Sequence, residues 1–269
     1  MSTRGAAKRA AREARSSPAL RALARGGYAA NGLVHVIIGV IVIVIAVGGR
    51  GESDQAGAFK TIAAAPLGFV ALWVLALLLG GLGVWHAADG LLTSRRSDVR
   101  KWGVRISEWG QALVFLALAA VSASVALGAR PDADETAEDA SRGVLTLPGG
   151  PWLLGIAGIG IGIGGVAFVV MGLRRSFRRK MSIPSGALGS GATVLGVVGF
   201  VAKGVALVVV GILLTVAAIK VDPGSAGGLD GAIRALLDVF AGPFLVAVVG
   251  AGFIAYGAFC FFRARYARL

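Results

Sequence analysis

The chain has 269 residues, of which 56% are hydrophobic and 15% charged, and its mean hydropathy is +0.79. This composition excludes a soluble globular domain of this length and favours a multipass membrane protein. A formal net charge of +13 would suit a nucleic-acid binder. However, no aromatic residue interleaves the arginines of the N-terminal segment to stack on bases, so we expect no nucleic-acid partner.

Six apolar stretches of about 20 residues or more follow one another, each long enough to cross a hydrocarbon core of roughly 30 Å. They are Gly27–Gly49, Leu67–Leu92, Ile106–Gly128, Pro151–Leu173, Gly196–Ile219 and Gly242–Phe262. The sequence therefore predicts an all-α polytopic membrane protein with six transmembrane helices.

A two-helix unit is repeated three times along the chain. Near its start, aligned glycines have a residue in register four positions earlier: Gly32 with Tyr28, Gly110 with Ile106, and Gly204 with Phe200. Near its end, aligned glycines have an aromatic residue four positions later: Gly81 with Trp85, Gly164 with Phe168, and Gly252 with Tyr256. Units with two crossings share one orientation, so we expect three parallel two-helix repeats with pseudo-threefold symmetry. The predicted divisions are a basic tail (1–26) and repeats at 27–94, 95–180 and 181–269, the last including a basic C-terminus.

Basic and acidic residues alternate between the two ends of the predicted helices. Clusters of lysine and arginine, including Arg95, Arg96, Arg174 and Arg175, lie at the termini and between repeats, whereas the loops inside the repeats are acidic. The positive-inside rule then predicts that both termini are cytoplasmic. The first twenty residues contain no apolar stretch, so we expect no cleavable signal peptide. The basic clusters are expected to contact anionic lipid headgroups.

The pattern Gly27-Tyr28-Ala29-Ala30-Asn31-Gly32, its counterpart from Gly199 to Gly204, and the glycine–aromatic pairs of the repeat ends resemble a family. It is the bacterial integral-membrane family known as domain of unknown function 1206. The resemblance covers roughly Arg21 to Arg265 and implies three tandem two-helix units in a bacterial plasma (inner) membrane. The middle unit departs from the pattern, with Ile106 at the aromatic position and Ser107-Glu108-Trp109 before Gly110. The family supplies no activity or functional residues.

Few ionisable residues lie within or beside the predicted spans, and counting along the helices brings them to similar depth near the cytoplasmic side. They are His35, His86, Asp89, Glu108 and Lys203. Such residues are costly in a membrane, so a cluster of them is a candidate functional site. We expect Lys203 to snorkel toward lipid phosphates.

His86 and Asp89 are three residues apart on one helix face and are predicted to hydrogen-bond. Their pair would make a structural contact between helices, or would belong to a proton or cation relay with His35 and Glu108. A further alternative is haem held by His35 and His86. Apart from this option, the sequence predicts no cofactor and no metal site.

Two further sets of residues recur with the repeats. Lys60, Arg142 and Arg234 lie in short predicted helices before the return spans, either as headgroup anchors or as an outer basic ring that attracts an anion. Pro66, Pro151 and Pro243 are predicted near the first turn of those spans. In the fourth span, Gly158 with Gly162 and Gly160 with Gly164 are spaced for close helix packing, which we expect on two sides.

The sequence carries no phosphate-binding loop, zinc-protease motif or nucleophile elbow, so we expect no enzymatic activity. Two classes of function stay open. The protein is either structural or accessory, binding lipids or a membrane-protein partner, or it transports a small solute, ion or proton along the pseudo-threefold axis. Scarce polar residues in the spans favour the first class.

Overall fold

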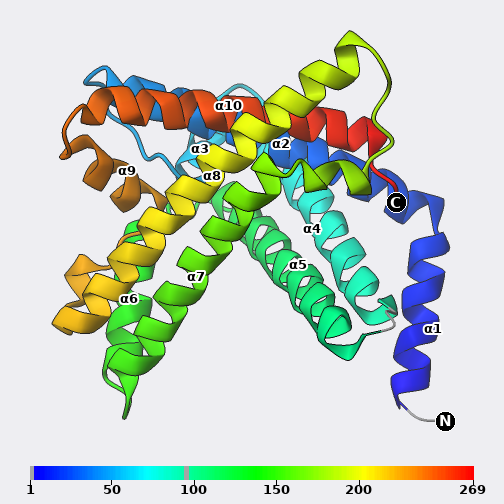
Figure 1. Cartoon of the computed structure of the whole chain (residues 1–269), viewed down its shortest axis with the longest axis horizontal. Helices are drawn as coiled ribbons and strands as arrows, with labels where there is room; N and C mark the ends of the chain where they lie inside the picture. Colours follow the sequence, from blue (N-terminus) through cyan, green and yellow to red (C-terminus); the bar gives the residue numbers. More distant parts are fainter. Residues whose placement is uncertain (1–2, 94–96) are drawn as a thin grey trace.

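The computed structural model describes residues 3–93 and 97–269, which form ten α-helices and two short 3-10 helices (Figure 1). Within this described part there is no β-strand, and an isolated antiparallel bridge joins Met181 to Ala267. The predicted all-α class is therefore confirmed. The predicted boundary between the first two repeats, at residues 94 and 95, lies outside the described residues, as do Arg95 and Arg96.

Among the described residues, six helices are long and apolar enough to span a membrane, as predicted. They are α2 (Pro18–Ala46), α4 (Gly68–Leu92), α5 (Asp98–Ala126), α7 (Gly150–Leu173), α8 (Ala187–Lys220) and α10 (Gly242–Tyr266). Helix α2 begins well before its predicted apolar stretch, because Ser17 caps it by accepting a hydrogen bond from the Leu20 N–H and Pro18 occupies its first turn.

Shorter helices connect the spans. They are α1 (Thr3–Ser16), α3 (Gln55–Ala63), α6 (Ala133–Leu145), η1 (Ser176–Lys180), η2 (Pro223–Ser225) and α9 (Leu229–Leu237). The predicted short helix before each return span is confirmed in α3, α6 and α9. Pro151 and Pro243 lie in the first turns of α7 and α10 as predicted, whereas Pro66 lies in the turn before α4.

The turn into the return helix is built in the same way in all three repeats. The residue before the helix has a left-handed backbone: Leu67 with φ 62°, Gly149 with φ 75° and Ala241 with φ 58°. A glycine follows each time, and a Cβ there would collide with a carbonyl of the preceding short helix: Gly68 with Ile62, Gly150 with Val144, and Gly242 with Leu237. The repeats inferred from the sequence therefore share a local geometry as well as a pattern.

The closest helix pairs join different repeats. They are α2 with α10, α4 with α5, and α7 with α8, and Figure 1 shows each pair lying side by side. The α2/α10 pair joins the first repeat to the last. Each of these pairs therefore combines the first helix of one repeat with the return helix of the repeat before it, in cyclic order, as a pseudo-threefold arrangement requires.

Glycines seven residues apart bring two of these pairs together. Gly32 and Gly39 of α2 face Gly257 and Gly250 of α10, and Gly204 and Gly211 of α8 face Gly165 and Gly158 of α7. A Cβ on any of these eight glycines would come within 3.0 Å of the partner helix. Such close approach lets backbones make van der Waals contact where lipid supplies no hydrophobic driving force.

The middle repeat does not close on itself. Within the outer repeats α2 packs on α4 and α8 packs on α10, but α5 and α7 hardly touch and splay apart in Figure 1. A Cβ on Gly81 would lie 2.6 Å from the Cβ of Leu23, and one on Gly252 would collide with Ala202. A Cβ on the equivalent Gly164 would meet no described atom within 4 Å.

The prediction that α7 packs on two sides is therefore wrong. Gly158 is buried against α8, and Gly162 touches Gly211 through its backbone. Gly160 and Gly164 instead belong to an open face, because the second neighbour that α7 would need, α5, lies elsewhere.

Candidate functional site

A chain of hydrogen bonds joins all three repeats in the half of the bundle that carries the basic clusters. Arg263 of α10 donates to the hydroxyl of Tyr28 at 3.1 Å, and that hydroxyl lies 3.3 Å from Nε2 of His86 in α4. Nδ1 of His86 is 2.6 Å from Glu108 of α5, whose second carboxylate oxygen accepts from Lys180 of η1 at 2.7 Å. We call these five residues the His86 network.

The partners fix how His86 is protonated. A carboxylate only accepts hydrogen bonds, so Nδ1 carries the proton and donates to Glu108, which leaves Nε2 to accept from Tyr28. The side chains of His86 and Glu108 are only 3% and 2% exposed, so each needs these partners to be buried at all. The guanidinium of Arg263 also lies over the Tyr28 ring, 4.2 Å from its centroid. The network therefore ties helices of all three repeats together with its hydrogen bonds satisfied.

A second, smaller group surrounds His35. Nδ1 of His35 lies 2.8 Å from the backbone oxygen of Asn31, so it donates there, and Nε2 accepts from Lys203 at 3.1 Å. The Lys203 ammonium also lies over the ring of Tyr256, 4.7 Å from its centroid. The amide of Asn31 in turn contacts Sγ of Cys260 at 3.4 Å. The expectation that Lys203 snorkels outward is wrong, because its ammonium group points inward, where it donates to His35 and lies over the Tyr256 ring.

Asp89 lies outside both groups. It forms an ion pair of 3.0 Å with Arg15 of α1, and that guanidinium also covers the Trp85 ring at 5.0 Å. The predicted hydrogen bond between His86 and Asp89 is therefore wrong, since His86 pairs with Glu108 across α4 and α5. The single predicted cluster is thus two buried groups, one around His86 and one around His35, with Asp89 serving to hold α1 against α4.

The two polar groups also contain four residues that the sequence does not predict there: Tyr28, Arg263, Lys180 and Asn31. Tyr28 is the repeat aromatic, which indicates packing, and Lys180 and Arg263 lie in basic clusters outside the spans, which indicate membrane topology. A usable signal was the departure of the middle unit: Glu108 stands where the other units have Ala30 and Ala202. A carboxylate that replaces alanine at a packed helix position requires a buried partner.

The histidines do not fit an axial haem site. Both ring nitrogens of His35 and both of His86 already have partners within the protein. Among the described residues, no group of three or more His, Cys, Asp or Glu side chains is arranged to hold a metal ion.

Each residue of the predicted outer basic ring forms its own separate ion pairs. Lys60 pairs with Glu52 at 2.6 Å, Arg142 with Glu138 and Asp139 at 2.7 and 2.8 Å, and Arg234 with Asp230 at 2.8 Å. Burial by itself would raise the pKa of Asp230, but hydrogen bonds from Ser53 and Arg234 outweigh it and lower that pKa. Because acidic neighbours already neutralise each cation, the expected attraction of an anion to a ring of positive charge is not supported.

Comparison with known proteins agrees with the repeat architecture. The chain is 24% identical over 258 residues to "Uncharacterized protein YxxB" of Bacillus subtilis (strain 168), an alignment that covers 93% of this chain and 92% of that protein. No solved structure matches. Residues 26–92, 109–175 and 198–267 each match the family described as "Domain of Unknown Function (DUF1206)". Three tandem matches over most of the chain, one in each two-helix unit of the fold, show that this protein belongs to the DUF1206 family.

Proposed function

We propose that this protein is a non-catalytic accessory protein of the membrane, whose middle repeat receives a transmembrane helix of a partner membrane protein. The observation that carries the proposal is the open face of α7. Gly164 has no described neighbour for a Cβ, while its equivalents Gly81 and Gly252 are packed against the helix that begins their own repeat. The same packing position is therefore unfilled in one repeat of three.

The chemistry of this face suits a helix. Gly160 and Gly164 are one turn apart, a spacing that lets a second backbone approach closely in lipid. Large apolar side chains flank them, with Ile156 and Ile163 66% and 64% exposed. On α5, Leu113 is 70% exposed.

The basic end is proposed to be cytoplasmic, in a bacterial plasma membrane and in contact with anionic lipid headgroups. The support is the location of Arg174, Arg175 and Lys180 beyond the end of α7, together with the basic residues that precede α2. An insertion reporter fused to either terminus tests the orientation, and an external position of one terminus would refute it.

The docking proposal is tested by extracting the full chain gently from its own membranes and measuring the mass of the complex by native mass spectrometry. The double variant Gly160→Leu with Gly164→Leu fills the open face, so we expect the partner to be lost while the chain itself stays folded. Gly191→Leu is the matched control, because a Cβ there also meets no described atom. Equal complexes from all three proteins, or a bare wild-type chain, would contradict the proposal.

Proton transport is the second candidate, and the His86 network favours it. Hydrogen bonds run without a break from Lys180, whose side chain is 59% exposed, through Glu108 and His86 to Tyr28. His86→Leu interrupts that path without adding a charge. Proton flux into liposomes that contain the wild type but not His86→Leu would support transport, and no flux above empty liposomes would remove it.

A further inference from the structure

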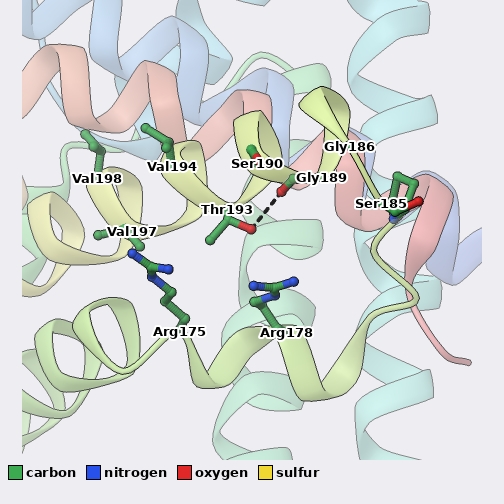
Figure 2. Close-up of a pocket in the computed structure, with 11 residues that line it drawn as sticks. Arg175, Arg178, Ser185, Gly186, Gly189, Ser190, Thr193, Val194, Val197 and Val198 are labelled. Carbon is green, nitrogen blue, oxygen red and sulfur yellow. Dashed lines mark hydrogen bonds between the residues drawn. The ribbon is translucent and has the colours of Figure 1, made fainter.

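A hollow of about 340 Å³ lies between the η1 segment and the first turns of α8, at the basic end of the bundle. Figure 2 shows the guanidinium groups of Arg175 and Arg178 pointing into it from the η1 side, toward α8. Ser185 and Ser190 contribute hydroxyl groups to the lining. Its size is that of a small-molecule site.

The charged residues that line this hollow are all basic. Two arginines line it, and none of its lining residues is acidic. Within the described part of the chain, neither Arg175 nor Arg178 forms an ion pair, although arginines elsewhere, such as Arg142 and Arg234, do. The lining therefore offers two guanidinium groups and two serine hydroxyls as donors, and a phosphate group accepts several charge-assisted hydrogen bonds at once.

The lining changes from polar to apolar along α8. Val197 lies beside the Arg175 guanidinium in Figure 2, and Val194 and Val198 also contribute to the lining. Val194 and Val198 are 61% and 46% exposed, so they are available to an acyl chain that runs along the outside of the helix. A free phosphate would use only the polar part, whereas a phospholipid uses both.

The depth of the hollow also suits a headgroup. Helix α8 has 34 residues, or about 51 Å at 1.5 Å per residue, against a hydrocarbon core of roughly 30 Å. The apolar stretch predicted within α8 begins only at Gly196, so the first turns of the helix extend into the headgroup region. No side chain caps this end of α8, so the positive end of its dipole adds to the charge of the arginines.

We propose that the hollow between η1 and α8 is a binding site for an anionic phospholipid, with Arg175 and Arg178 on the phosphate and the α8 valines along an acyl chain. The site is separate from the open face of α7, so it does not depend on the proposed partner helix. The proposal assigns a specific site to the contact with anionic headgroups proposed above, and it rests on that contact.

The test uses the detergent-solubilised full chain in native mass spectrometry with phosphatidylglycerol added at a fixed ratio. We expect Arg175→Gln with Arg178→Gln to lower occupancy by one phosphatidylglycerol about tenfold, as lost hydrogen bonds to a charged group predict. The matched control is Arg174→Gln with Arg179→Gln, which removes the same charge from neighbouring residues that do not line the hollow. It should bind as the wild type does.

Several outcomes would overturn the proposal. Equal losses in the two double variants would assign the binding to bulk charge, and unchanged occupancy in both would remove the arginines from the site. Phosphatidylcholine carries the same phosphate with a neutralising ammonium, so binding it equally well would refute selection for an anionic lipid. Displacement of phosphatidylglycerol by millimolar inorganic phosphate alone would assign the hollow to a free anion. A melting temperature shared by all variants confirms that folding is not the cause.

Discussion

The outer repeats and the middle repeat use the same pattern to different ends. Gly81 and Gly252 allow the two helices of their repeats to pack, whereas Gly164 lies on an open face and α5 rests on α4 instead of α7. A repeat position can therefore keep its residue while its neighbour changes. What distinguishes the middle repeat is the missing contact between its own two helices, α5 and α7.

The contact of α5 with α4 includes a buried polar connection. Glu108 stands at the position of Ala30 and Ala202, and it reaches His86 of the first repeat and Lys180 beyond the second. Glycines hold the outer repeats by close packing. In the middle repeat a buried carboxylate hydrogen-bonds α5 to α4, in addition to the close contacts of Gly83 with Leu116 and of Gly90 with Trp109. The two modes respond differently to substitution, which makes the comparison testable.

The largest effect is expected from Glu108→Ala. It leaves the Nδ1 proton of His86 without a partner in a site that is almost fully buried, and an unpaired buried donor of this kind costs up to about 3 kcal/mol. The unfolding free energy in detergent, measured by denaturant titration, should fall by that amount. Lys180→Ala is the comparison and should cost less, about 1 kcal/mol, because that side chain is 59% exposed and Glu108 keeps its hydrogen bond from His86. An unchanged Glu108→Ala protein would show that packing alone holds α5.

Gly252→Leu should be the next most damaging change. Its side chain would collide with Ala202 of α8, and overpacking of this kind costs about 3 kcal/mol. Gly164→Leu is the same substitution at the equivalent position and should leave the midpoint of thermal unfolding nearly unchanged. Similar destabilisation in the two variants would mean that α7 is packed on both sides after all.

Much of the fold could be predicted, because membrane spans and repeats leave strong one-dimensional signals. The apolar stretches predict the six candidate membrane-spanning helices, because a lipid environment permits few alternatives to spanning helices. The repeat of Gly81, Gly164 and Gly252 gave the correct units but not their packing. A glycine permits close approach on any side where a neighbour exists, and the sequence does not contain the position of that neighbour.

Less of the candidate site could be predicted, for a related reason. His86 and Glu108 could be predicted as members of a candidate site, because an ionisable residue within or beside an apolar stretch is conspicuous in the sequence. Their pairing could not be predicted. Residues three or four apart on one helix are neighbours, which favours Asp89 as the partner of His86, whereas no spacing in the sequence identifies a partner on another helix. Arg263 was missed because an arginine at the end of a span is also a topology signal.

The capping aspartates extend the comparison to the acidic end. Asp54 caps α3 and is 2% exposed, and burial, its largest influence, raises its pKa to about 6 despite the hydrogen bond from Gly57. Asp132 caps α6 of the middle repeat and is exposed. A carboxyl with a raised folded pKa binds protons more readily when folded, so stability falls as the pH rises from about 4 to about 6.

Asp54→Asn keeps an effective cap but does not titrate, so it should abolish this slope, which amounts to about 2 kcal/mol. The measurement is the unfolding free energy in detergent at pH 4, 5, 6 and 7. Asp132→Asn should retain the slope of the wild type. The same pH dependence in the wild type and in Asp54→Asn would contradict the burial of an ionisable Asp54.

The smallest difference concerns the arginines of the short helices. Arg142 of the middle repeat pairs with two exposed carboxylates, so Arg142→Ala should cost about 0.5 kcal/mol or less. Arg234 pairs with Asp230, which is 5% exposed and also accepts two hydrogen bonds from Ser53. Removing Arg234 leaves that carboxylate with only its Ser53 donors, so Arg234→Ala should cost about 1 kcal/mol. Thermal unfolding at low ionic strength resolves the pair, and a larger loss for Arg142→Ala would show that the middle repeat is held at this end by its own charges.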